Sequence, residues 1–165
     1  MPHCPRFGEF PQVELYMDQV LSVLEAAAAP FCPELKPQER LLTPAMINNY
    51  VKQRLLPPPR KKRYRPEQLA ALLLICLFKN LLPMGDIKEL LAACFAPEGE
   101  LQPAAYDYFC EVLEQSFDEP GGFCAPDNEE PPAAAAISPR QARLIRQAAA
   151  AYTQKTQLQR ALHQQ

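Results

Sequence analysis

The chain has 165 residues, 48% of them hydrophobic, which suits one domain with a buried core and excludes a wholly disordered protein. No window approaches the roughly 18 apolar residues of a membrane helix, and the N-terminus lacks the apolar run of a secretory signal. We therefore expect a soluble, cytoplasmic protein.

The formal net charge of −2 hides a separation of charge along the chain. The segment 40–65 contains eight basic residues and no acid, whereas the segment 98–130 contains ten acids and no base. Such a local concentration indicates a polyanion-binding surface better than a global isoelectric point does. The alternative interpretation is a basic turn that only meets solvent.

The cysteines and histidines predict no metal site. None of the six cysteines is spaced as C-x-x-C, and His3 and His163 stand at opposite ends of the chain. Cys76, Cys94 and Cys110 lie among apolar residues at helical spacing. We expect these three to be buried as small hydrophobes and to remain reduced.

The first predicted element is a helix over residues 11–29, where apolar residues recur at helical spacing until a proline ends it. Thr43 and Pro44 start a second helix, because threonine caps free backbone amides and proline is tolerated at the first helical position. We expect this helix to run over residues 44–55. The prolines 57–59 then favour an extended conformation that projects the basic residues after them.

The next helix contains ten consecutive apolar residues, 69–78, and must be covered on every side. It is predicted to be the central core element, half of a dimer interface, or both. A short helix over residues 86–95 follows. The segment 103–118 is predicted to be an amphipathic helix with its acids opposite an apolar face, where they fit a solvated surface.

Residues 119–137 have the glycine, proline and alanine content of a linker, and a C-terminal helix is predicted over residues 138–165. Leu144, Ala151 and Leu158 lie seven residues apart in this helix. The spacing is a weak coiled-coil signal, and the alternative is an amphipathic helix docked on the rest of the chain.

The order of the middle elements suits the reading of a nucleic-acid duplex. A helix with exposed polar residues fits the major groove, and a basic loop beside it can contact phosphates. The run MINNYVKQRLLPPPRKKRYRPEQLAALLLICLFKNLLPMGDIKELL, residues 46–91, resembles the bacterial family of domains of unknown function numbered 1836. That resemblance extends over residues 10–95 and includes the segment VELYMDQVLSVLE.

A second, more distant resemblance, over residues 43–91, is to the MerR-type winged helix-turn-helix. Its recognition-helix and wing positions are matched by Ile47, Tyr50, Leu55, Leu56, Tyr64 and Arg65. Arg54 stands where that pattern usually has glycine, and no clear first helix of a helix-turn-helix directly precedes Thr43.

These resemblances imply a mainly α fold: a MerR-like winged helix-turn-helix domain with additional C-terminal helices. The expected organisation is a DNA-binding domain over residues 1–96, an acidic helix over 97–118 packed on it, the linker and the C-terminal helix. The chain is then a bacterial transcriptional regulator that binds double-stranded DNA, and we expect it to act as a homodimer. No motif identifies a small-molecule effector.

In this hypothesis the helix 44–55 enters the major groove, and residues 57–65, called the wing from here on, contact phosphates. Asparagine suits adenine, and lysine or arginine suits guanine or phosphate. For Tyr64, as for Tyr50, packing against the long helix is the competing interpretation. The candidate DNA contacts are Asn48, Asn49, Lys52, Arg60, Lys61, Lys62, Arg63, Tyr64 and Arg65.

Two other hypotheses remain open. The segment 57–65 could be a proline-rich, basic ligand of a non-enzymatic interaction adaptor. The acids of 98–130 could instead fold back on the wing as an internal mimic of DNA. We expect no enzyme, catalytic residue or cofactor, because the core has no histidine and the chain has no glycine-rich phosphate loop.

Overall fold

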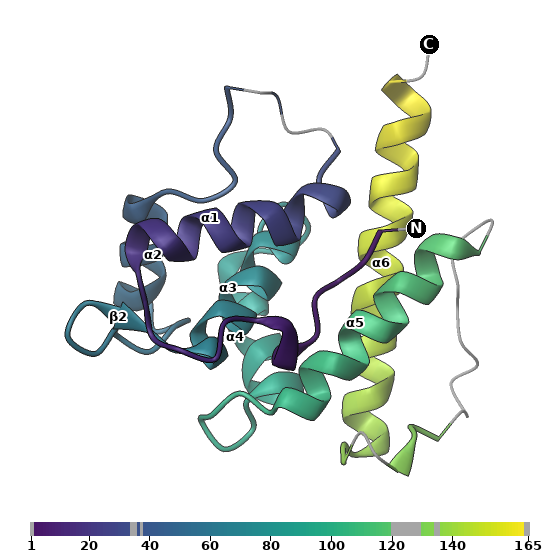
Figure 1. Ribbon diagram of the computed structural model, residues 1–165. Coiled ribbons are helices and arrows are strands. Elements are labelled where there is room, and N and C mark those ends of the chain that lie inside the picture. Colours follow the sequence, from purple (N-terminus) through teal and green to yellow (C-terminus); the bar gives the residue numbers. More distant parts are fainter. Residues whose placement is uncertain (1, 34–35, 37, 120–129, 134–135, 164–165) are drawn as a thin grey trace.

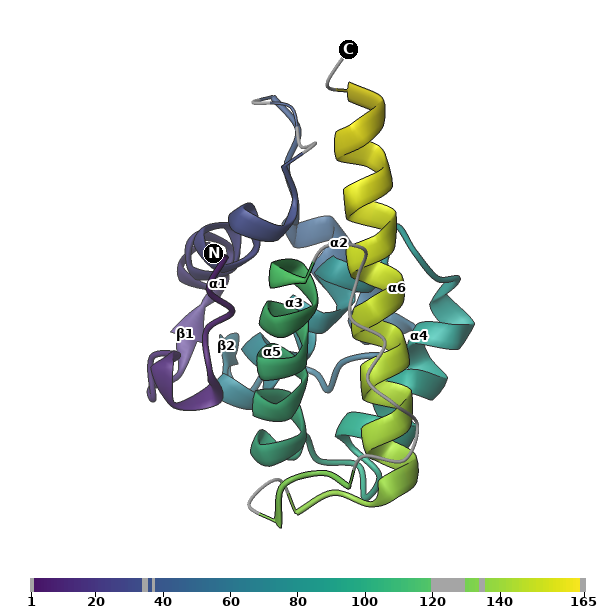
Figure 2. The ribbon, with the colours of Figure 1, turned by 90° about the vertical axis from the view of Figure 1, so that its right-hand side faces the viewer.

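Helix α3 (Pro66–Phe78) lies at the centre of the computed structural model, which describes residues 2–33, 36, 38–119, 130–133 and 136–163 (Figures 1 and 2). The described chain is mainly helical, as predicted. Most of the predicted linker 119–137 lies outside the described residues. The elements around α3 are η1 (Phe7–Glu9), β1 (Leu15–Tyr16), α1 (Met17–Ala28), η2 (Ala29–Phe31), α2 (Pro44–Lys52), β2 (Arg63–Tyr64), α4 (Met84–Leu90), the π-helical turn η3 (Leu91–Phe95), α5 (Pro103–Asp118) and α6 (Pro139–His163).

Every residue of α3 from Gln68 to Phe78 is buried. The rings of Phe78 and Phe95 each pack on Phe109 of α5, with centroids 5.5 and 5.8 Å apart. This burial leaves α3 no apolar surface for a second subunit, so it is a core helix and not a dimer interface. In the part of the chain that the structure describes, no helix is long and apolar enough to cross a membrane.

Helix α1 begins at Met17, six residues later than residue 11, where the sequence predicts it to start. Residues 15–16 instead form β1, which pairs antiparallel with β2, so that Leu15 lies opposite Tyr64. The amide of Tyr16 then donates to the side chain of Gln19 at 2.9 Å, which marks the start of the helix. The prediction was wrong here because helical periodicity does not detect pairing with a distant strand.

Helix α6 packs along α5, as the two views show from different sides (Figures 1 and 2). Leu144, Ala151 and Leu158 do not form the docked stripe: Leu144 is half-buried, and the other two are exposed. The helix is therefore docked on the body through a different face from its heptad-spaced one. That buried face contains Ala142, Ile145, Ala149, Tyr152, Thr153 and Thr156.

Residues 3–7, called the N-terminal strap from here on, bind to α5. Glu114 accepts hydrogen bonds from the Cys4 amide at 2.7 Å and from both terminal nitrogens of Arg6 at 2.9 Å. Asp107 accepts from the Phe7 amide at 2.6 Å. These two acids were expected to meet solvent, and the structure shows that they anchor a segment about 100 residues away in sequence.

The three thiols expected in the core are buried. Burial raises the pKa of Cys76 to about 12 and that of Cys94 to about 11. Burial also places the pKa of Cys110 well above its ordinary value. The prediction that these residues act as small buried hydrophobes is therefore confirmed.

The strap makes stability depend on pH through Glu114. Burial alone would raise the pKa of Glu114, but hydrogen bonds from Arg6 and the Cys4 amide outweigh it and hold this pKa below its ordinary value of 4.5. A carboxyl whose pKa is lower in the folded chain stabilises the fold above its unfolded pKa. That contribution is lost as the pH falls through the folded pKa.

We expect Glu114→Gln to lower the free energy of unfolding by about 2 kcal/mol at pH ~7, because Arg6 loses its charged acceptor. The difference from the wild type should shrink below pH ~4.5 as the wild-type carboxyl is protonated. Denaturant unfolding at both pH values measures this. Glu111→Gln, on the exposed side of the same helix, is the control. An equal deficit at both pH values would contradict this role of the carboxylate.

Candidate nucleic-acid interface

Helix α2 begins where the sequence predicts. The Thr43 hydroxyl accepts a hydrogen bond from the Met46 amide at 3.2 Å, and Pro44 occupies the first helical position. Ile47 and Tyr50 are buried and fix the inner face of the helix. Burial also raises the pKa of Tyr50, as expected for a phenol packed against the core.

Helix α2 ends at Lys52, three residues before the predicted end. The amide of Arg54 donates to the Val51 carbonyl at 3.1 Å, and the amide of Leu55 donates to the Tyr50 carbonyl at 3.0 Å. This pair of bonds is a Schellman motif, and it requires a left-handed residue after the cap. Arg54 has that conformation, with φ of 59°. This left-handed conformation explains why the MerR-type pattern usually has glycine at the position of Arg54.

The wing ends in a two-residue hairpin turn. Arg60 and Arg63 exchange backbone hydrogen bonds of 3.0 Å in both directions. Lys61 and Lys62 form the tip, with φ of 51° and 60°. Positive φ at both tip residues is the type I′ geometry, in which Asn-Gly is the favoured sequence. The chain therefore places two lysines where other residues would be less strained.

The base of the wing is a strand rather than a free loop. Tyr64 pairs with Leu15 and is only 2% exposed, and burial raises its pKa. This corrects the expectation that Tyr64 contacts DNA, because its ring packs in the core. The guanidinium of Arg63 lies over the ring of Tyr16 at 5.2 Å and donates to its hydroxyl at 3.2 Å.

Gln68 connects the wing to α3. Its side-chain oxygen accepts from the Arg65 amide at 2.7 Å, and its nitrogen donates to the carbonyls of Pro57 at 2.9 Å and Pro58 at 3.3 Å. Gln68 is 4% exposed, so these bonds lie in a protected setting. Gln68 is not among the candidate residues expected from the sequence. The available signal was a glutamine three residues after the cap position of a proline-started helix.

The remaining candidate contacts are all exposed and come from two neighbouring elements. Figure 1 shows α2 and β2 on the same side of the molecule. Asn48, Asn49 and Lys52 share one face of α2, because residues three and four apart are neighbours on a helix. The wing supplies the other cations, which are Arg60, Lys61, Lys62, Arg63 and Arg65.

The described acids of α5 do not cover this surface. Glu114 pairs with His3 and Arg6, and no acid in 98–119 forms an ion pair with the wing. The internal-mimic hypothesis therefore has no support in the described part of the chain, and residues 120–129 lie outside it.

The path from α1 to α2 is long for a helix-turn-helix. Residues 29–43 connect the two helices, and in the described part of this connector the helical residues are those of η2. A helix-turn-helix has a turn of only about three or four residues. The arrangement is thus a single helix followed by a hairpin wing.

Replacing Arg54 by glycine should remove backbone strain. A left-handed conformation costs a non-glycine residue about 1–2 kcal/mol. Glycine avoids this cost, but its greater conformational entropy in the unfolded chain offsets part of the gain in stability. We expect Arg54→Gly to raise the free energy of unfolding by about 1 kcal/mol, measured by denaturant unfolding. Gln53→Gly, at the cap residue with φ of −81°, is the control and should destabilise the chain. A less stable Arg54→Gly variant would show that the arginine side chain contributes more than the strain costs.

Comparison with known proteins identifies a family without a described activity. Residues 5–109, more than half of the chain, match the family model described as Domain of unknown function (DUF1836). No curated protein and no solved structure matches the chain significantly. The matched region runs from the N-terminal strap through α2, the wing and α3 into α5, and α6 lies beyond it. The chain therefore belongs to the family described as Domain of unknown function (DUF1836).

Proposed function

We propose that this protein is a DNA-binding transcriptional regulator, with a winged domain similar to the MerR type. Helix α2 would enter the major groove of double-stranded DNA, and the wing would contact the phosphates beside it. The observation that carries the proposal is the wing tip, where Lys61 and Lys62 both have positive φ. Strain of this kind persists where surrounding structure imposes it and is concentrated at functional sites.

The cations of this surface are available for phosphates. Among the described residues, Lys52, Arg60, Lys61, Lys62 and Arg65 are exposed and none forms an ion pair. Exposed and unpaired cations supply the part of DNA affinity that depends on salt. Arg63 differs from them, since Tyr16 and Glu14 orient its guanidinium.

Helix α2 has one buried apolar face and one exposed polar face, as a DNA recognition helix does. Its inner face is buried through Ile47 and Tyr50, and its outer face presents Asn48, Asn49 and Lys52. Two amides and one ammonium on adjacent turns match the donors and acceptors of base edges and phosphates. A homodimer remains part of the proposal, with the exposed apolar residues Leu158 and Leu162 of α6, rather than α3, as its available contact.

The interaction-adaptor alternative requires an accessible, extended peptide. The carbonyls of Pro57 and Pro58 are instead bonded to Gln68, and residues 60–63 are closed into a hairpin. These contacts favour a structured wing. Limited proteolysis distinguishes the two functions, because a structured wing resists trypsin at residues 60–65 and an exposed ligand is cut quickly.

A double substitution at the wing tip separates charge from fold. Lys61→Asn combined with Lys62→Gly supplies the favoured turn sequence and removes two cations. We expect the free energy of unfolding to rise by about 1–2 kcal/mol. Affinity for duplexes of any sequence should fall, and the slope of log affinity against log salt should decrease by about 2. Fluorescence anisotropy at several salt concentrations measures both.

The matched control, Arg140→Ala with Arg143→Ala, removes two exposed arginines from α6. Figure 1 shows α6 on the opposite side of the molecule from β2. Its salt slope should equal that of the wild type. An unchanged slope in the wing-tip variant, or no binding of random duplex by the wild type at low salt, would refute the proposed function.

The asparagines of α2 should affect sequence preference rather than general affinity. We expect Asn48→Ala or Asn49→Ala to weaken binding to the preferred duplex by about 1–3 kcal/mol for each lost bidentate contact, with little change on random DNA. Selection of duplexes from a random pool, followed by competition binding, tests this. Gln147→Ala removes an exposed amide from α6 as the control. The same ranking of duplexes for all variants would contradict a reading role of α2.

A further inference from the structure

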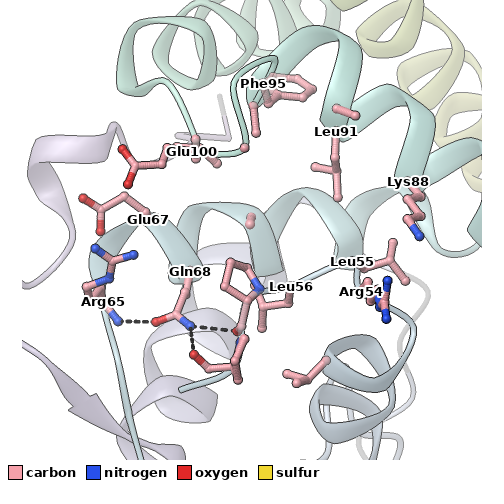
Figure 3. A pocket seen from close by; sticks show the side chains of 18 of the residues that line it. Arg54, Leu55, Leu56, Arg65, Glu67, Gln68, Lys88, Leu91, Phe95 and Glu100 are labelled. Carbon is pink, nitrogen blue, oxygen red and sulfur yellow. Dashed lines mark hydrogen bonds between the residues drawn. The ribbon is translucent and has the colours of Figure 1, made fainter. Parts of the chain in front are cut away.

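A pocket of about 570 Å³ lies at the base of the wing (Figure 3). It is bounded by the stretch from the end of α2 to Pro58, by the first half of α3, by α4 with the π-helical turn, and by the segment 99–103 that leads into α5. The volume falls within the roughly 300–1,000 Å³ of small-molecule sites. Of the candidate DNA contacts, Arg65 alone lines this space.

The walls of the pocket are largely apolar. Leu55 and Leu56 contribute one wall, and Leu91 and Phe95 contribute another. These last two residues belong to the π-helical turn, where the Ala96 amide donates to the Leu91 carbonyl at 2.8 Å. Such turns are rare and occur frequently at functional sites. An apolar chain or ring can thus be enclosed here.

The polar groups are placed at the two ends of the pocket. Figure 3 shows Arg54 and Lys88 at one end, and Arg65, Glu67 and Glu100 at the other. Within the described chain, neither Arg54 nor Lys88 forms an ion pair. At the far end, one carboxylate oxygen of Glu67 is buried and has no hydrogen-bond partner. The first end has two cations and no acid in the lining, so it can bind an anion. At the second end the two carboxylates outnumber the single cation Arg65, so this end is better suited to accept a hydrogen bond.

The pocket is also continuous with the attachment of the wing. Gln68 lines it, and the same side chain donates to the carbonyls of Pro57 and Pro58. A molecule in the pocket therefore contacts both Pro57 and Pro58, which form the first part of the wing, and Gln68, which attaches them to α3. An anion beside Arg54 would also reduce the positive potential next to α2.

We propose that this pocket binds a small amphipathic carboxylic acid and that its occupancy weakens the binding of DNA by α2 and the wing. The carboxylate lies between Arg54 and Lys88, and the apolar body packs on Leu91 and Phe95. A hydroxyl at the far end donates to Glu67. Binding of the acid is independent of DNA, and only its effect on DNA rests on the proposed function.

Isothermal titration calorimetry with decanoate, below its micelle concentration, tests the site in the absence of DNA. We expect one saturable site, with tighter binding of 10-hydroxydecanoate because it reaches Glu67. Decyltrimethylammonium, a cation of the same chain length, should not bind there. Lys88→Met should weaken the binding of decanoate about tenfold. The control Arg143→Met should leave it unchanged.

Ala92→Trp fills the pocket from an exposed position, so it should abolish binding without disturbing the core. Circular dichroism and denaturant unfolding check that the variants are folded. No saturable binding of decanoate, or binding that survives both Lys88→Met and Ala92→Trp, would overturn the site.

A second titration measures the affinity for duplex DNA with the acid absent and at saturation. We expect the acid to lower this affinity about fivefold in the wild type and not in Ala92→Trp. Unchanged affinity while decanoate still binds would overturn the coupling alone. If the wild type binds no DNA at all, the proposed function fails, and the calorimetry still decides whether the pocket binds the acid.

Discussion

The burial of α3 on every side is the constraint on which the rest of the structure depends. A helix without a polar face cannot meet water, and α1, η1 and α5 pack against it. Its first turn also contains Gln68, a buried amide that needs polar partners. Those partners are the carbonyls of Pro57 and Pro58 and the amide of Arg65. Covering the core helix therefore also positions the wing.

The structure explains both the basic segment 40–65 and part of the acidic segment 98–130. The basic residues of the wing remain exposed, and Arg54, Lys61 and Lys62 adopt conformations that disfavour them. Strained cations that face solvent are difficult to explain by stability alone. Two of the acids of α5, Asp107 and Glu114, instead bind the N-terminal strap. Opposite charges in the two halves therefore do not imply that the halves neutralise each other.

The pocket beside the wing offers a route from a small molecule to the proposed DNA-binding surface. Gln68 lines the cavity and also bonds the stem of the wing, so any shift of this side chain changes both. Regulation of this kind needs two sites and an element whose position differs between two states. The segment Pro57–Pro58 is suitable for that element, because the buried side-chain amide of Gln68 links its carbonyls to α3, while Tyr64 holds the other end of the wing.

Sequence alone determined the features that depend on neighbouring residues. The start of α2 at Thr43 and Pro44, the fully apolar α3, the buried thiols and the basic segment were all readable, because caps and periodicity act within a few residues. The glycine-like position of Arg54 was recognised as well, although its reason, the left-handed cap, needed the structure.

Only the tertiary structure decided the features that join distant segments. The pairing of β1 with β2 shortened α1 and buried Tyr64. The N-terminal strap binds Asp107 and Glu114, two acids that were expected to meet solvent. Helix α6 packs on the body through a face that its heptad spacing did not indicate. The pocket is formed by four separate segments. Local propensity carries no information about such contacts, because their free energy comes from packing between residues that are far apart in the chain.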